Sequence, residues 1–176
     1  MNASAGSAGE FRFCPYCGVP LEELRRGDRT RRVCTSCGFV AYRNPTVGVA
    51  VVVLREGAIL LGRRTGSYAG DWCIPCGHVE WDEDLRDAAV REFFEETGLH
   101  VQLVGVAAVH SNFHNPDRQT VGVWFHGVVV GGELQAGDDL DDVAFFPLDA
   151  PPEGLAFPTD RLVIEELRSS AHLFSS

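Results

Sequence analysis

The sequence predicts an α/β protein with a mixed β-sheet, preceded by a small cysteine-rich segment. Several apolar, β-branched runs accompany only two stretches with the apolar periodicity of a helix, a pattern typical of a sheet packed against helices. Two Cys-x-x-Cys pairs precede the first run and lie in a stretch with few large apolar side chains. A chain of 176 residues suits one medium-sized domain and a small appendage. We therefore expect two folding units, the first held together by its cysteines.

The cysteine pairs read Cys-Pro-Tyr-Cys-Gly and Cys-Thr-Ser-Cys-Gly, with 16 residues between them. Each turn can direct two thiolates at one point, so two turns complete a tetrahedral Zn²⁺ site that lets so short a segment fold. The alternatives are two disulfides, disfavoured in a cytoplasmic chain, and a redox dithiol, disfavoured by the duplicated glycine-terminated turns. We predict a structural zinc ribbon over residues 11–43, with the ligands Cys14, Cys17, Cys34 and Cys37.

Composition and charge argue against two classes of partner. No apolar run reaches the ~20 residues needed to span a bilayer, and we expect no contact with a membrane. Residues 1–10 lack the charged and apolar regions of a signal peptide, so we expect a flexible tail and a cytoplasmic protein. The net charge of −10 argues against general nucleic-acid binding, although seven arginines fall within residues 11–43.

Apolar runs in the second unit predict strands at residues 46–54, 58–62, 72–75, 101–109, 121–130 and 144–148. The first of these runs is nearly continuous in apolar residues, which is typical of a buried strand. A basic, flexible loop is expected at residues 63–70, in which Arg63 and Arg64 either contact a phosphate or are simply solvated. An amphipathic helix following Thr159-Asp160 is predicted to close the fold.

The other predicted helix lies within residues 77–99, which read GHVEWDEDLRDAAVREFFEETGL. Asp84 is predicted to cap its N-terminus, because a short acidic side chain can accept a hydrogen bond from a backbone N–H of the first turn. Gly98 is predicted to end the helix in the left-handed conformation. The apolar residues at helical spacing, which should face the sheet, are Leu85, Ala88, Ala89 and Phe93.

Three carboxylates lie in the last turns of this predicted helix. Glu92, Glu95 and Glu96 stand at positions i, i+3 and i+4, so they share one helix face. Like charges at this spacing repel, and anions near a helix C-terminus oppose the helix dipole. A hard divalent cation such as Mg²⁺ or Mn²⁺ would offset this cost, because such ions prefer oxygen ligands. The alternative is a solvated acidic face.

The order of residues in this stretch resembles the Nudix box. It runs Gly77, five residues, Glu83, seven residues, Arg91-Glu92, an apolar residue, one residue, Glu95-Glu96, one residue, Gly98 and an apolar residue. The chain therefore resembles the Nudix hydrolase family, and residues 44–176 are expected to form its domain. The resemblance implies a Nudix α/β/α sandwich, which binds divalent cations and hydrolyses a diphosphate linked to a nucleoside.

The resemblance also implies roles for single residues. Glu92, Glu95 and Glu96 would hold Mg²⁺ or Mn²⁺, and the backbone carbonyl of Cys76 precedes the box glycine, where relatives commonly bind the metal. Arg91 and Glu83 would orient each other. The group that deprotonates the attacking water is either Glu95 in the box or a downstream carboxylate, for which the candidates are Asp139 and Asp142.

Substrate choice lies outside the box. The ribbon, its exit AYRNP, the lead-in PCGHVE and the late LAFPT resemble Nudix enzymes that act on ADP-ribose, FAD or related dinucleotides and release AMP and X-phosphate. Zinc-ribbon NADH pyrophosphatases carry an SQPWPFPxS-type array, which is absent from this sequence. NADH and NAD-capped RNA are therefore less favoured than ADP-ribose and FAD, and they are kept as the alternative substrates. The predicted substrate contacts are Arg63, Arg64, Phe113, Arg118 and Asp139, and the candidate aromatic residues for an adenine slot are Phe113, Trp124, Phe145 and Phe157.

A second class of function is a regulator whose ribbon binds nucleic acid or protein while the Nudix domain senses a nucleotide. The complete box disfavours it, because such sensors tend to lose box glutamates, and the basic ribbon favours it. A third role for the ribbon, as a dimerisation or domain-packing element, is compatible with the enzyme. We expect a homodimeric pyrophosphohydrolase with a small-molecule nucleotide substrate.

Overall fold

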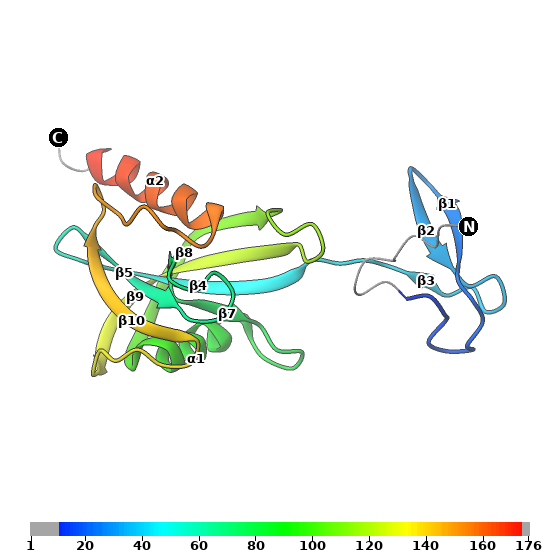
Figure 1. Ribbon diagram of the computed structural model, residues 1–176, viewed down its shortest axis with the longest axis horizontal. Coiled ribbons are helices and arrows are strands. Elements are labelled where there is room, and N and C mark those ends of the chain that lie inside the picture. The colour runs from blue at the N-terminus through cyan, green and yellow to red at the C-terminus, as the bar shows by residue number, and fades with distance from the viewer. Residues whose placement is uncertain (1–10, 174–176) are drawn as a thin grey trace. The chain divides into compact units, whose positions relative to one another are not determined.

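The computed structural model describes residues 11–173, which form two compact units (Figure 1). One unit comprises the described chain up to Pro45 together with Pro116–Arg118, and the other comprises Thr46–Asn115 and the chain from Gln119 onward. Residues 1–10, which were expected to be a flexible tail, lie outside the described residues. None of the helices within residues 11–173 is long and apolar enough to cross a membrane.

The first unit is built around its cysteines and a three-stranded antiparallel sheet, in the order β1 (Glu22–Arg26), β2 (Arg29–Val33) and β3 (Val40–Ala41). Gly18 and Gly38 close the two Cys-x-x-Cys turns at φ 72° and 79°, a conformation that favours glycine. The sulfur atoms of Cys14, Cys17, Cys34 and Cys37 all lie within 4.8 Å of one another. The predicted four-cysteine ribbon is therefore confirmed, and no disulfide joins these cysteines.

The second unit is a seven-stranded mixed sheet with two helices. Its central path runs β10-β5-β4-β9-β8, with β6 paired to β5 and β7 paired to β4. The strands are β4 (Thr46–Arg55), β5 (Ala58–Arg64), β6 (Trp72–Cys73), β7 (Cys76–His78), β8 (Leu99–Asn112), β9 (Thr120–Gly132) and β10 (Leu140–Pro147). The helices are α1 (Leu85–Thr97) and α2 (Pro158–Leu173). The pairing of β4 with β9 is parallel and the others are antiparallel, so the predicted mixed sheet is confirmed.

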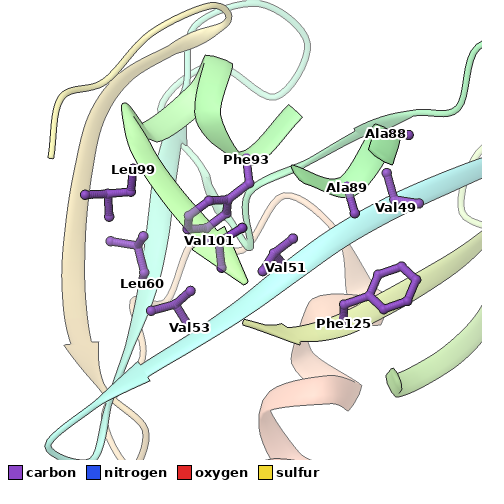
Figure 2. Close-up of a cluster of buried hydrophobic side chains, with 10 residues drawn as sticks. All are labelled: Val49, Val51, Val53, Leu60, Ala88, Ala89, Phe93, Leu99, Val101 and Phe125. Carbon is purple, nitrogen blue, oxygen red and sulfur yellow. The ribbon is translucent and has the colours of Figure 1, made fainter. Parts of the chain in front are cut away.

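The central strand β4 is apolar along most of its length because both of its faces are buried. Val49, Val51 and Val53 point to the side on which Phe93 of α1 packs (Figure 2). The intervening residues Ala50 and Val52 lie in a second core cluster with Val163 and Ile164 of α2. The sheet therefore lies between two helices, as expected for an α/β/α sandwich.

Several element boundaries differ from the sequence prediction. Arg63 and Arg64 do not begin a loop but end β5, because they pair with Asp142 and Leu140 of β10. Asp142, a candidate base from the sequence, accordingly lies within a strand. Strands β8 and β9 are longer than predicted because they pair with each other from Leu99–Gly132 to Asn112–Thr120. Helix α2 begins at Pro158, which places Asp160 in its first turn.

Candidate active site

The ends of α1 determine where its glutamates lie. Asp84 caps the N-terminus by accepting a hydrogen bond from the backbone N–H of Arg86 at 2.8 Å. Gly98 takes φ 69° at the C-terminus and donates its N–H to the carbonyl of Phe94 at 2.8 Å. Both predicted caps are confirmed. Because Phe93 is anchored in the core, the adjoining positions Glu92 and Glu96 turn toward β7.

Glu96 is a buried carboxyl group at the wall of a cleft. Its exposed fraction is 1%, and its Oε2 accepts a hydrogen bond from the backbone N–H of Cys76 at 2.7 Å. Burial raises the pKa of Glu96 well above its ordinary value, because the charged form loses its hydration. Among residues 11–173 no arginine forms an ion pair with it. This carboxylate is therefore placed where a cation would stabilise its charge.

Glu92 lies against the backbone of the box glycine. A Cβ added to Gly77 would stand 1.9 Å from the Cδ of Glu92, so only glycine permits this approach. Burial is the main cause that raises the pKa of Glu92, while an ion pair with Arg91 at 3.0 Å opposes it. The glycine and the glutamate thus form one close contact between β7 and α1.

Glu95 diverges from the other two glutamates. Its carboxylate pairs with Nη1 of Arg91 at 2.9 Å, is half-exposed and does not line the cleft. Among the described residues, only the four ribbon cysteines bring three or more metal-binding groups within 4.8 Å of one another. The shared helix face therefore brings Glu92 and Glu96 to one cleft, and it leaves Glu95 at the rim.

Arg91 connects the box loop to the helix. It forms a two-pronged contact with Glu83, with Nε–Oε1 at 2.7 Å and Nη2–Oε2 at 2.8 Å. The same guanidinium donates to the carbonyl of His78 at 3.3 Å. The hydrogen bonds that Arg91 donates to Glu83 lower the pKa of Glu83 and raise the pKa of Arg91. The contact predicted between these two side chains is present.

The cleft has a volume of about 390 Å³ and runs from these glutamates to a group of aromatic rings. Its acidic lining consists of Glu80, Glu92, Glu96, Asp138, Asp139 and Asp160, and its ring-bearing lining consists of His78, His114, Trp124 and Phe157. Strand β4 contributes Gly48, Val49 and Ala50 to the floor. A cleft lined by both carboxylates and flat rings suits a metal-bound phosphate joined to a base.

Arg64 is the only arginine among the lining residues described in the structure. It is ion-paired with Asp139, donates to the carbonyl of Ser67 at 2.9 Å and lies over the ring of Phe157 at 5.4 Å. Its neighbour Arg63 points elsewhere, because alternate strand residues face opposite sides, and it pairs with Asp141 at 2.7 Å. Of these two neighbouring arginines, only Arg64 thus lines the cleft.

Of the other predicted substrate contacts, Asp139 lines the cleft, whereas Phe113 and Arg118 do not. Phe113 is exposed on the loop after β8, and Arg118 belongs to the first unit. The adjacent His114 lines the cleft instead, and its Nε2 hydrogen-bonds to the hydroxyl of Tyr68 at 2.7 Å. The sequence offers no periodic signal that distinguishes His114 from Phe113 in an irregular loop.

Asp160 is a second buried carboxyl group, which sequence reasoning missed. It is 1% exposed and accepts hydrogen bonds from the backbone N–H of Ile74 at 3.0 Å and from Nε1 of Trp124 at 3.3 Å. Burial is the main cause that raises the pKa of Asp160 to about 7. This side chain joins α2 to the segment before the box and positions the indole ring that lines the cleft.

We expect Asp160 to make the stability of the fold depend on pH. Its folded form keeps a proton up to about pH 7, whereas the unfolded form loses it near pH 3.8. The folded state therefore holds the extra proton in this window, and the free energy of unfolding falls as pH rises, by a few kcal/mol at order of magnitude. Asp160→Asn should reduce this decline, measured as urea midpoints at pH 5 and pH 8.

The asparagine keeps one of the two acceptor oxygens, so the variant should be less stable than the wild type at the lower pH. Asp149→Asn, at an exposed position, is the matched control and should follow the wild-type pH dependence. An unchanged pH dependence in Asp160→Asn would contradict the assignment.

Fold and cleft together define a Nudix hydrolase, and the chain belongs to the NUDIX family. A family model described as "NUDIX domain" matches residues 44–167, and a zinc-ribbon model described as "Nudix N-terminal" matches residues 12–43. The resemblance inferred from the box and the cysteines is confirmed.

Among curated proteins, the chain is 35% identical over 132 residues to an ADP-ribose pyrophosphatase of Methanocaldococcus jannaschii, covering 72% of this chain and 76% of that protein. It is 31% identical over 148 residues to an NAD-capped RNA hydrolase NudC of Chromobacterium violaceum, covering 84% of this chain and 54% of that protein. The chain thus spans about half the length of the NudC relatives.

Solved structures show the same fold. A NUDIX hydrolase from Nitrosomonas europaea superposes with a TM-score of 0.76 at 28% identity, covering 89% of this chain and 92% of that chain. An ADP-ribose pyrophosphatase from Streptococcus suis superposes with a TM-score of 0.59 at 28% identity, covering 72% and 92% of the two chains.

Proposed function

We propose that this protein is a metal-dependent pyrophosphohydrolase that cleaves the diphosphate of a nucleoside diphosphate-X compound, ADP-ribose or FAD above others, to AMP and X-phosphate. The observation that carries the proposal is the cleft in which Glu92 and Glu96 face the rings of Trp124 and Phe157. The 35% identity to an ADP-ribose pyrophosphatase supports the substrate class.

The carboxylates of the cleft suit Mg²⁺ or Mn²⁺. Glu96 is buried with a raised pKa, and Glu92 is pressed against Gly77, so oxygen donors converge here on adjacent turns of α1. We infer that Glu92 and Glu96 hold the ion, with Glu95 at the rim and the backbone carbonyl of Cys76 as further ligands. When bound, such an ion neutralises the charge of the diphosphate and acidifies a water molecule.

Arg91 and Glu83 would orient these carboxylates. A single guanidinium contacts Glu83, Glu92 and Glu95, so it can hold both glutamates of the helix relative to the loop. Glu95 remains our candidate for the base that takes the proton from water, since it is half-exposed and shares the guanidinium of Arg91 with Glu92. Of the alternatives, Asp139 lines the cleft but is paired with Arg64, and Asp142 does not line it.

The aromatic residues of the cleft would hold the base of the nucleotide. Trp124 is fixed by its hydrogen bond to Asp160, and Phe157 lies beside the rings of His114 and Tyr68, with centroid distances of 5.8 and 5.5 Å. Flat rings of this kind stack on nucleobases. Arg64, between Phe157 and Asp139, is placed to contact a phosphate. Phe113, Arg63 and Arg118 stay predictions from the sequence.

A second candidate substrate is NADH or NAD-capped RNA. The NudC relatives match 81–89% of this chain, which favours this candidate. The missing SQPWPFPxS-type array disfavours it. A homodimer in the cytoplasm, as expected from the sequence, remains part of the proposal, and sedimentation of the purified protein would test the dimer.

A substrate panel tests the function. AMP release is measured with ADP-ribose, FAD, NADH and an NAD-capped RNA, each with Mg²⁺ or Mn²⁺. We expect kcat/KM to be highest for ADP-ribose or FAD and activity to vanish with EDTA. A preference for the capped RNA would favour the second candidate, and no hydrolysis of any compound would contradict the proposed activity.

A further inference from the structure

The ribbon, defined as the described residues 11–45, is basic within an acidic protein. It holds the seven arginines Arg12, Arg25, Arg26, Arg29, Arg31, Arg32 and Arg43 against the three acids Glu22, Glu23 and Asp28. Four thiolates around one Zn²⁺ would remove two of the four excess positive charges and leave about two. The whole chain therefore has a net charge of −10, whereas the ribbon by itself has a positive net charge.

The arginines of the β1–β2 hairpin are crowded at its tip. Arg26 and Arg29 are directly cross-strand from each other, an arrangement in which like charges destabilise a sheet. Within residues 11–173 neither guanidinium has an acidic partner. In contrast, Arg32 is used structurally, because it donates to the carbonyl of Phe11 at 3.2 Å and pairs with Glu23 at 3.7 Å. The Arg26–Arg29 pair thus destabilises the hairpin and, in the part of the chain that the structure describes, makes no hydrogen bond or ion pair comparable with those of Arg32.

Exposed aromatic rings accompany these charges. The exposed fractions are 52% for Phe11, 58% for Phe13, 80% for Tyr16 and 65% for Tyr42. The guanidinium of Arg31 lies over the ring of Tyr42 at 5.2 Å, and a hollow of about 280 Å³ lies beside this pair. Exposed flat rings and exposed guanidinium groups can together contact the two repeating parts of a nucleic-acid strand, its bases and its phosphates.

We propose that the ribbon binds single-stranded nucleic acid, with Arg26, Arg29 and Arg31 on the phosphates and Tyr42 stacked on a base. This goes beyond the proposed hydrolysis, which uses the other unit. An acidic peptide would engage the arginines but would leave the exposed rings without a flat partner. The net charge of the whole chain argues against nucleic-acid binding. At physiological salt, however, attraction depends on the charges close to the bound strand, and the net charge of the ribbon is positive.

The test uses the zinc-loaded full chain and a fluorescein-labelled strand of about 12 nucleotides, as RNA and as DNA. Fluorescence anisotropy gives the affinity at about 50 and about 200 mM salt. Arg26→Ala/Arg29→Ala should weaken binding about tenfold or more and reduce the slope of log K against log salt by about 1.4. Tyr42→Ser should weaken binding about fivefold or more without changing that slope.

The matched control is Arg161→Ala/Arg168→Ala, which removes two exposed arginines of α2 and the same charge. We expect it to bind within about twofold of the wild type, and we expect all variants to keep their zinc and their hydrolysis of ADP-ribose. If Arg26→Ala/Arg29→Ala loses its zinc, its weaker binding no longer tests the proposal. The affinity of Tyr42→Ser for the strand then decides whether the ribbon binds it. No binding by the wild type, equal weakening by the control pair, or tighter binding of a polyglutamate peptide would overturn the proposal. Failure of hydrolysis alone would leave it standing.

Discussion

Glu96→Gln is expected to lower kcat for diphosphate hydrolysis by roughly 10²–10⁴-fold while the protein stays folded. The amide is nearly the same size, and its oxygen can still accept the hydrogen bond from the N–H of Cys76. It cannot carry the negative charge that a divalent cation requires. Because burial raises the pKa of Glu96, a neutral side chain suits the site, and Tm should be unchanged or higher. AMP release and thermal unfolding measure the two effects.

Glu165→Gln is the matched control, since it makes the same chemical change at an exposed position of α2. It should retain wild-type turnover. Unchanged turnover in Glu96→Gln would remove this glutamate from the mechanism. Lost turnover together with a lower Tm would instead make Glu96 a structural residue.

Removal of zinc is expected to unfold the ribbon, since structural zinc sites of this kind contribute about 10 kcal/mol or more to folding. The ribbon has little core of its own, and a hydrogen bond from the backbone N–H of Cys37 lowers the pKa of Cys34 to about 7, which favours a thiolate. Cys34→Ser should bind less than one zinc per chain. Trypsin should then cleave it rapidly at the ribbon arginines, while the zinc-loaded wild type resists.

Cys73→Ser is the control for the loss of a buried cysteine outside the ribbon, and it should retain zinc. Metal content by mass spectrometry and the mass of the tryptic fragments give the outcome. Equal resistance to trypsin with and without zinc would contradict a zinc-dependent ribbon.

The features predicted well from the sequence are those determined by neighbouring residues. Asp84 and Gly98 act on the helix they border, and each glycine of a Cys-x-x-Cys-Gly turn closes its own turn, so a short window of sequence suffices. Strand β4 was predicted equally well from the sequence, because its burial on both faces requires an unbroken run of apolar residues.

The features that were missed depend on partners far away in the chain. Strand β5 continues through Arg63 and Arg64 because β10 extends alongside them, and nothing local shows how far a partner strand reaches. Asp160 looks like an ordinary acid in a first helical turn, and its burial follows from the approach of Trp124 and Ile74. Likewise, the box spacing predicts a shared face for three glutamates but not that Arg91 holds Glu95 at the rim.

The parallel pairing of β4 with β9 has a consequence for how the enzyme matures. Thr46 and Thr120 are 74 positions apart, and the chain between them contains α1 and four strands. Closing so long a loop is slow, because its entropy is lost before the contacts form. Since the two strands together line the cleft, we expect a newly made chain to stay inactive until this long-range pairing has formed.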